Sequence, residues 1–124
     1  MFIDDLKTYI INQGLIKTGV SFELEFYDEA LATELMCMAI YDSDCELGRY
    51  SIQIMARYKA LKTARDYLYT IYDHFFDYRQ DTMVDMEVLG TKCRFKPVNK
   101  PLFIKKINGL YNYTMNFEVW TQKQ

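Results

Sequence analysis

The segment RYSIQIMARY (Arg49–Tyr58) continues without a helix or strand breaker into KALKTARDYLYTIYDHF (Lys59–Phe75), and these two halves determine the fold. In the first half apolar and polar side chains alternate, and only Met55 interrupts the pattern. A period of two is typical of an antiparallel strand with one buried face. The face predicted to be buried carries Tyr50, Ile52, Ile54, Ala56 and Tyr58, and the other carries Arg49, Ser51, Gln53 and Arg57.

The second half changes to spacings of three and four residues, which predicts a helix over about residues 59–77. Its apolar stripe consists of Leu61, Ala64, Leu68, Ile71 and Phe75. Because the strand has one apolar face and the helix one apolar stripe, we expect the helix to pack back onto the sheet.

The first part of the chain contains a second helix and two further strands. Apolar residues at helical spacing predict a short amphipathic helix over about residues 2–13. Residues 21–27 alternate as a half-buried strand does, whereas the continuous apolar run 35–41 indicates a strand covered on both faces. We expect residues 42–48 to form a polar loop.

The last part of the chain adds strands at residues 83–88, 92–97 and 111–119. Residues 98–109 form either a long loop or the first arm of a hairpin that turns at Asn108-Gly109. The sequence therefore predicts one α+β domain over residues 1–124. Its sheet is mixed and mostly antiparallel, with about five to six strands and both helices on one face.

Composition excludes several classes of protein. A net charge of −2 over 124 residues gives no basic footprint for nucleic acid. No apolar run reaches the ~20 residues that a membrane span requires, and the start of the chain lacks the pattern of a secretory signal. Three cysteines without motif spacing indicate reduced thiols. We therefore expect a protein of the cytosol, or of a particle assembled there.

Catalytic and metal-binding patterns are weak. His74 is the only histidine, so a half-exposed structural histidine is favoured over a general base, and Cys37 and Cys93 lack a histidine partner. Asp42, Asp44 and Glu46 alternate as at the start of a calcium loop, but the glycine and the final glutamate are not at the required offsets. No glycine-rich nucleotide loop is present. The sequence predicts neither an enzyme nor a cofactor.

Charge is segregated along the chain. A basic band, as we call it, combines residues of the strand at 92–97 with residues of the segment that follows it. An acidic segment follows the strand at 35–41. These groups are either solvated surfaces or the two halves of a head-to-tail interface between copies of the chain. The basic band consists of Lys92, Arg94, Lys96, Lys100, Lys105 and Lys106, and the acidic segment of Asp42, Asp44 and Glu46.

Three phrases resemble the small minor capsid or tail terminator proteins of long-tailed bacteriophages. They are FIDDLKTY (Phe2–Tyr9), YSIQIMAR (Tyr50–Arg57) directly before a long helix, and GLYNYTMNFEV (Gly109–Val119). The resemblance follows the order of elements over nearly the whole chain. It departs from the family at residues 42–48, where members often carry a turn with proline or glycine and this chain carries the acidic segment.

The resemblance implies a mixed sheet with helices on one side and no catalytic residues. It also implies a subunit that forms a ring, typically a hexamer, on the last turn of the tail tube. Such a ring stops the polymerisation of the tube protein and offers a surface to the head connector. We expect the basic band to meet acidic patches on a neighbour or to line the lumen, where it would also face the passing DNA.

Two other functions compete with the tail terminator. A neck protein that closes the head or joins it to the tail would need a domain of similar size and charge. A small cytosolic enzyme or ligand-binding domain would need a concave pocket with converging polar groups, and no such convergence is visible in the sequence. Both virion functions place the protein at the junction of head and tail, assembled in the cytoplasm of the host.

Overall fold

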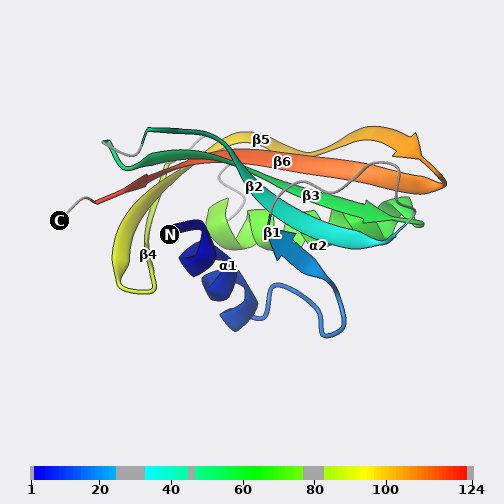
Figure 1. Ribbon diagram of the computed structural model, residues 1–124, viewed down its shortest axis with the longest axis horizontal. Helices are drawn as coiled ribbons and strands as arrows, with labels where there is room; N and C mark the ends of the chain where they lie inside the picture. The colour runs from blue at the N-terminus through cyan, green and yellow to red at the C-terminus, as the bar shows by residue number, and fades with distance from the viewer. Residues whose placement is uncertain (1, 25–32, 45–46, 77–82, 123–124) are drawn as a thin grey trace.

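A computed structural model describes residues 2–24, 33–44, 47–76 and 83–122, which form two helices and one six-stranded sheet (Figure 1). The strand order is β1-β2-β3-β6-β5-β4, and all neighbours are antiparallel except β1 and β2. The predicted α+β fold with a mixed, mostly antiparallel sheet is confirmed. The elements are α1 (Phe2–Asn12), β1 (Phe22–Leu24), β2 (Leu35–Asp44), β3 (Arg49–Tyr58), α2 (Leu61–Phe76), β4 (Val84–Val88), β5 (Thr91–Ile107) and β6 (Leu110–Thr121).

The pair β3–α2 is organised as the sequence predicts. Ile52, Ile54 and Ala56 of β3 are fully buried, and α2 packs across β3, β6 and β5. The spacing places Leu61 on the apolar stripe, but its side chain is 36% exposed. It is the first residue of the helix, and the buried part of the stripe begins at Ala64. The side chains that α2 buries are Ala64, Leu68, Ile71, Tyr72, Phe75 and Phe76.

An aromatic cluster fixes α2 to the sheet. The ring of Phe75 in α2 stacks on Phe95 of β5 at 4.7 Å and lies 5.9 Å from Phe117 of β6. Phe95 and Phe117 lie 5.9 Å apart on neighbouring strands. Each such pair adds ~0.5–1.5 kcal/mol beyond simple burial. The cluster therefore joins the longest helix to two strands from the end of the chain.

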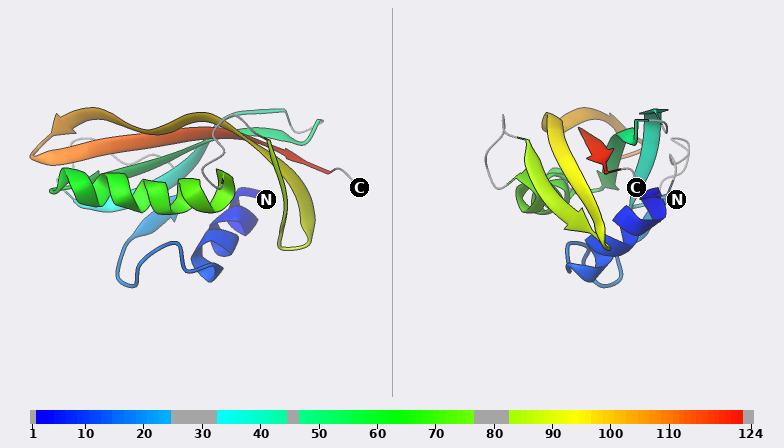
Figure 2. Two further views of the ribbon diagram at one scale, coloured as in Figure 1. Left: turned by 180° about the vertical axis from the view of Figure 1, so that it is seen from behind. Right: turned by 90° about the vertical axis from the view of Figure 1, so that its left-hand side faces the viewer.

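Both helices cover the same face of the sheet, as predicted (Figures 1 and 2). Leu6 and Ile10 of α1 are fully buried, and the ring of Phe2 stacks on Tyr50 of β3 at 5.3 Å. The sheet curls around this helical layer, so that β4 and the adjoining part of β5 approach α1 (Figure 2). We call the opposite face of the sheet, which no described helix covers, the open face.

The open face contains a buried arginine that the alternating pattern does not predict. Arg57 lies on the face of β3 expected to be wet, yet it is only 1% exposed. Its Nε donates a hydrogen bond to the carbonyl oxygen of Thr33 at 3.2 Å. Residues that precede β2 therefore approach the open face at this point, which the period of two in β3 alone could not indicate.

Two segments differ from the simplest reading of the sequence. The prediction of a polar loop from Asp42 onwards is wrong for its first three residues. β2 continues to Asp44, and Asp42–Asp44 pair with Arg49–Ser51 of β3 after a register shift. For residues 98–109 the hairpin alternative is confirmed, since β5 runs to Ile107 and the turn at Asn108 and Gly109 has φ values of 51° and 77°. Both values suit the type I′ turn that Asn-Gly favours.

Other predicted boundaries agree with the structure where it describes them. The apolar run of β2 is buried from Met36 to Ala39, as expected of a strand covered on both faces. The strand predicted over 21–27 is present at Phe22–Leu24, and residues 25–27 lie outside the described residues. Neither described helix is long and apolar enough to cross a membrane.

Gly48 connects the turn between β2 and β3 to the end of β6. Its φ is +68°, and its carbonyl oxygen accepts hydrogen bonds from the backbone N–H of Thr121 at 2.8 Å and from Thr121 Oγ1 at 3.1 Å. A Cβ at this position would lie 2.7 Å from the carbonyl oxygen of Thr121. Only glycine therefore fits both the left-handed backbone and this close approach.

We expect Gly48→Ala to destabilise the fold more than Gly90→Ala does. Gly90 also has a positive φ, +87°, but an added Cβ there meets nothing within 4 Å. Both variants lose ~1–2 kcal/mol through left-handed backbone strain, and Gly48→Ala loses a further ~1–3 kcal/mol through overpacking. Urea denaturation measures the difference. Equal losses of stability in the two variants would show that the contact with Thr121 is not tight.

His74 joins the two helices. Its Nε2 lies 2.9 Å from the hydroxyl oxygen of Tyr9 in α1, and the two rings are 5.8 Å apart. Half-burial lowers the pKa of His74 below its ordinary 6.5. Burial also raises the pKa of the neighbouring Asp73 carboxyl. The histidine is therefore neutral in the folded chain at neutral pH, which fits a structural contact between α1 and α2.

Stability should fall as the pH is lowered from about 7.5 to about 5.5, because unfolded His74 takes up a proton in this window and folded His74 resists it. For one proton the slope stays below ~1.4 kcal/mol per pH unit. Asp73 acts in the opposite direction and at more acidic pH. His74→Gln keeps a hydrogen-bonding group beside Tyr9 and should flatten the profile in urea titrations. If the slope of stability against pH is unchanged in this variant, titratable groups other than His74 cause the pH dependence.

Candidate interaction surface

The basic band lies along one strand rather than along a strand and a loop. Lys92, Arg94 and Lys96 are exposed on β5 and alternate with the buried Cys93 and Phe95. Lys100, Lys105 and Lys106, which the sequence places in a following loop or hairpin arm, are exposed on the same strand. β5 therefore carries all six cations of the band.

The half of the band next to β4 lies opposite acidic residues of the neighbouring strands. Arg94 Nε and Nη2 donate to Asp85 Oδ1 and Oδ2 at 2.7 and 3.1 Å, across the β4–β5 pair. The hydrogen bonds from Arg94 hold the pKa of the Asp85 carboxyl below its usual value. Lys92 lies opposite Glu87 in the same ladder, and Lys96 lies opposite Glu118 of β6. This half presents paired charges to solvent.

The other half of the band lies on the part of β5 that extends beyond its pairing with β4. β4 pairs with β5 only over Thr91–Phe95, and among the described residues no strand lies beside Lys96–Ile107 on the side away from β6. We call this stretch the free edge of β5. Its large apolar side chains are strongly exposed: Val98 53%, Leu102 54%, Phe103 43% and Ile104 47%.

The opposite side of the sheet has a free edge as well. β1 pairs with β2 only at Met36–Met38, and within the described part of the chain Ala39–Asp44 has no partner on that side. We call Ala39–Asp44 the free edge of β2. It includes Tyr41, which is 48% exposed, and two of the three predicted acidic residues.

The acidic segment makes local contacts. Asp42 Oδ2 accepts a hydrogen bond from Arg49 Nη2 at 3.1 Å, and Arg49 Nη1 lies 3.8 Å from Glu118 Oε1. Asp44 Oδ1 accepts from the backbone N–H of Leu47 at 3.2 Å. Glu46, the third predicted residue, lies outside the described residues. In the described part of the chain no three His, Cys, Asp or Glu side chains are grouped to hold a metal ion.

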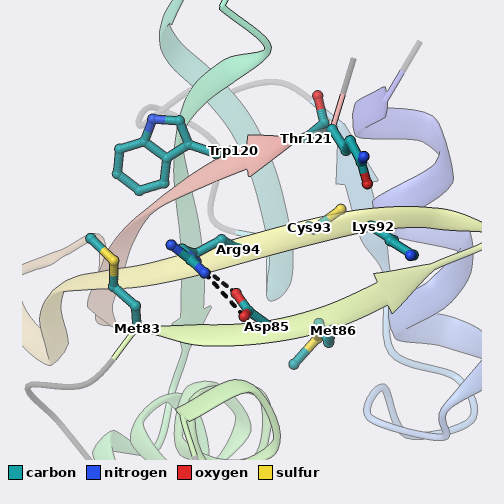
Figure 3. Close-up of a pocket in the computed structure, with 9 residues that line it drawn as sticks. Met83, Asp85, Met86, Lys92, Cys93, Arg94, Trp120 and Thr121 are labelled. Carbon is teal, nitrogen blue, oxygen red and sulfur yellow. Dashed lines mark hydrogen bonds and ion pairs between the residues drawn. The ribbon is translucent and has the colours of Figure 1, made fainter. Parts of the chain in front are cut away.

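An open groove of about 710 Å³ lies where β4, β5 and the end of β6 meet (Figure 3). The Arg94–Asp85 pair lies on its floor, with Trp120 and Met83 to the sides. Two of the polar side chains here, those of Arg94 and Asp85, are hydrogen-bonded to each other. The groove therefore offers a contact surface lined by an arginine and a tryptophan, residue types that dominate protein interfaces.

The two cysteines in the described part of the chain have little access to solvent. Cys37 and Cys93 are buried, and burial raises the pKa of the Cys93 thiol to about 11. The thiolate is the reactive form, so Cys93 is inert near neutral pH.

The sequence indicated the basic band but missed its apolar component. Val98, Leu102 and Ile104 fall in a stretch with two prolines and three lysines, whose irregular pattern gave no clear strand face. The structure explains this, because β5 shifts register against β6 between residues 97 and 99, 99 and 102, and 103 and 105. Each shift moves the alternation by one residue, so no single period could reveal the exposed side.

The structure does not bring the basic band together with Asp42 and Asp44, the described residues of the acidic segment. The band lies on β5 and the two aspartates lie on β2, separated from it by β3 and β6. Comparison with models of known protein families and with curated proteins finds no match. Inference about function therefore rests on the surface itself.

Cys93 should resist alkylation by iodoacetamide at about pH 8, since a thiol with a pKa of about 11 is almost wholly protonated there and the side chain is only 5% exposed. We expect its labelling rate to rise by at least ~100-fold when urea unfolds the chain. Peptide mass spectrometry resolves Cys93 from the other cysteines. Fast labelling in the folded protein would contradict the burial of this side chain.

Proposed function

We propose that this chain is a structural virion protein of a long-tailed bacteriophage, a ring-forming tail terminator or minor capsid protein. In this function it caps the tail tube, stops polymerisation and provides the surface on which the head connector docks. The protein would be assembled in the host cytoplasm and reside at the junction of head and tail.

The observation that carries this proposal is the exposed apolar patch on the free edge of β5. Val98, Leu102, Phe103 and Ile104 lie within seven consecutive positions and are each about half exposed. Unpaired strands with large apolar side chains are normally protected or covered by a partner. The patch therefore favours a subunit of an assembly over an isolated soluble domain.

Further support comes from the positions of the three phrases that resemble tail terminators. Phe2–Tyr9 begins α1, Tyr50–Arg57 forms most of β3, and Gly109–Val119 forms the turn into β6 and most of that strand. β3 and β6 pair along their full length, and α1 packs on the same face as α2. The segments that carry the resemblance therefore include much of the structural core.

Capping of tail tubes tests the proposal. The purified chain is incubated with tail-tube protein from the same genome, and tube lengths are measured by negative-stain microscopy. We expect shorter tubes that end in an additional ring. Unchanged tube lengths without bound subunit would contradict the terminator function, and binding to the head connector alone would identify a neck protein instead.

A matched pair of variants connects this result to the apolar patch. Leu102→Asp/Ile104→Asp places charges on the patch, whereas Leu89→Asp changes a residue of similar exposure, 49%, at the tip of the β4–β5 hairpin. We expect the double variant to reduce capping by at least ~10-fold and the control to cap normally. Equal capping by both variants would show that the apolar patch does not contribute to capping.

A further inference from the structure

The β5–β6 hairpin ends at one end of the molecule, away from both chain termini (Figure 1). We use the name hairpin tip for residues 98–114, which contain the ends of both strands and the turn that joins them. The arrangement of apolar side chains and charges on this tip indicates the kind of partner that could cover it. The large apolar side chains that it exposes are those of Val98, Leu102, Phe103 and Ile104.

The exposed apolar side chains lie on both faces of the hairpin tip. Phe103 is opposite Tyr113 and its ring lies 5.8 Å from the Tyr113 ring, which belongs to the buried core on the helical face of the sheet. Leu102, one residue earlier, is opposite Thr114. Because successive side chains of a strand point to opposite faces, Leu102 lies on the open face.

A flat partner surface could cover only one of these faces. Leu102 is 54% exposed and Phe103 is 43% exposed, so the two faces present apolar side chains to water to a similar degree. Contact with one face would leave the apolar side chain of the other face in water, at a cost in buried area. A groove that receives the hairpin tip covers both faces at once. The tip therefore fits a concave surface better than a flat one.

The hairpin tip is basic and contains no carboxylate. From Val88 to Phe117 the sequence has no aspartate or glutamate. The residues of β6 opposite this part of β5 are uncharged, whereas the half of the basic band next to β4 lies opposite acidic residues. In the described part of the chain neither Lys100 nor Lys106 forms an ion pair. These two cations can therefore bind carboxylates of another molecule.

The two lysines border the exposed apolar side chains. Lys106 Nζ lies 4.8 Å from the centre of the Tyr111 ring, and the Phe103 ring lies 6.1 Å from the same tyrosine. Lys100 lies between Val98 and Leu102 in the sequence. A partner that buries the apolar side chains would therefore bring its own rim close to both ammonium groups.

We propose that the hairpin tip binds in a groove of a different protein, with apolar walls and with carboxylates at its rim. The walls would cover Leu102 and Phe103, and the rim carboxylates would meet Lys100 and Lys106. The inference names the kind of surface that the tail tube or the head connector would present, and so it rests on the proposed function.

A second copy of the chain is a poorer partner. The groove of Figure 3 contains two cations, Lys92 and Arg94, against the single carboxylate of Asp85, which Arg94 already binds. It would therefore repel the lysines of an incoming hairpin tip. Two tips in contact would bring the lysines of both copies together, and like-charge contacts are costly. Charge thus favours a different protein.

The exposed side chains also favour a protein over nucleic acid. Proteins that hold single strands stack the bases on exposed aromatic side chains. Three of the four exposed apolar side chains here are aliphatic, and the ring of Phe103 already lies against two tyrosines. Aliphatic side chains gain from burial in an apolar groove but offer no stacking surface for a base.

Removal of charge tests the rim of the groove. Lys100→Gln/Lys106→Gln removes two cations from the hairpin tip, and Lys7→Gln/Lys17→Gln is its matched control. Each pair includes one lysine over a tyrosine ring, at 4.8 Å for Lys106 and 5.6 Å for Lys17. Affinity for the tail-tube protein and the head connector of the same genome is measured by titration.

We expect the hairpin variant to bind one of these proteins at least ~10-fold more weakly than the wild-type chain and the control to bind normally. Equal affinities of the two variants would overturn the inference. So would a hairpin variant that loses affinity for duplex DNA and keeps its affinity for both proteins, because the tip would then be a nucleic-acid contact.

Substitutions on the two faces test the concave shape. Leu102→Asp changes the open face of the tip, and Phe103→Asp and Lys106→Glu change the helical face. Each should weaken binding by at least ~10-fold, whereas Leu89→Asp should not. Circular dichroism checks folding, and Lys106→Glu keeps the helical face testable if Phe103→Asp does not fold. An effect confined to one face would show a flat interface and overturn the groove.

The inference and the proposed function fail separately. Tail tubes that are capped equally well by all hairpin variants would support the terminator function and refute the docking of the tip. Uncapped tubes, together with a head connector that binds the tip through both faces, would do the reverse. Absence of binding to either protein would contradict both.

Discussion

The fold depends on the packing of α2 against β3, β5 and β6, with Phe75, Phe95 and Phe117 at its centre. This contact joins a helix from the middle of the chain to strands that follow it by twenty to forty residues. It also decides which face of the sheet is buried, because α1 then occupies the remaining space on the same side. Both described helices therefore cover the same face of the sheet.

Much of this arrangement could be predicted from the sequence, because the deciding patterns are local. Alternation in Arg49–Tyr58 and the stripe in α2 each specify one face, and the two faces have only one efficient way to meet. The turn at Asn108-Gly109 is a short-range signal of the same kind. The strand structure of Asp42–Asp44 was harder to predict. Polar residues at the end of a strand have the composition of a loop, and only their pairing with Arg49–Ser51 shows that the strand continues.

The sequence predicted the basic residues of the interaction surface but not its exposed apolar residues. Basic residues at every second position predicted the exposed face of β5 near Lys92. Their cross-strand partners, such as Asp85 opposite Arg94, come from other parts of the chain. The register shifts hid the apolar half, and Arg57 is buried by residues that precede a neighbouring strand. What sequence reasoning missed was in each case set by contacts between distant segments.

Pro97 and Pro101 limit how another strand can pair with the edge of β5. A proline has no amide hydrogen, so an incoming strand cannot extend its ladder along the whole edge. Amyloid-like growth requires such uninterrupted ladders. The exposed apolar side chains of this edge therefore do not offer a continuous ladder for the growth of a fibril.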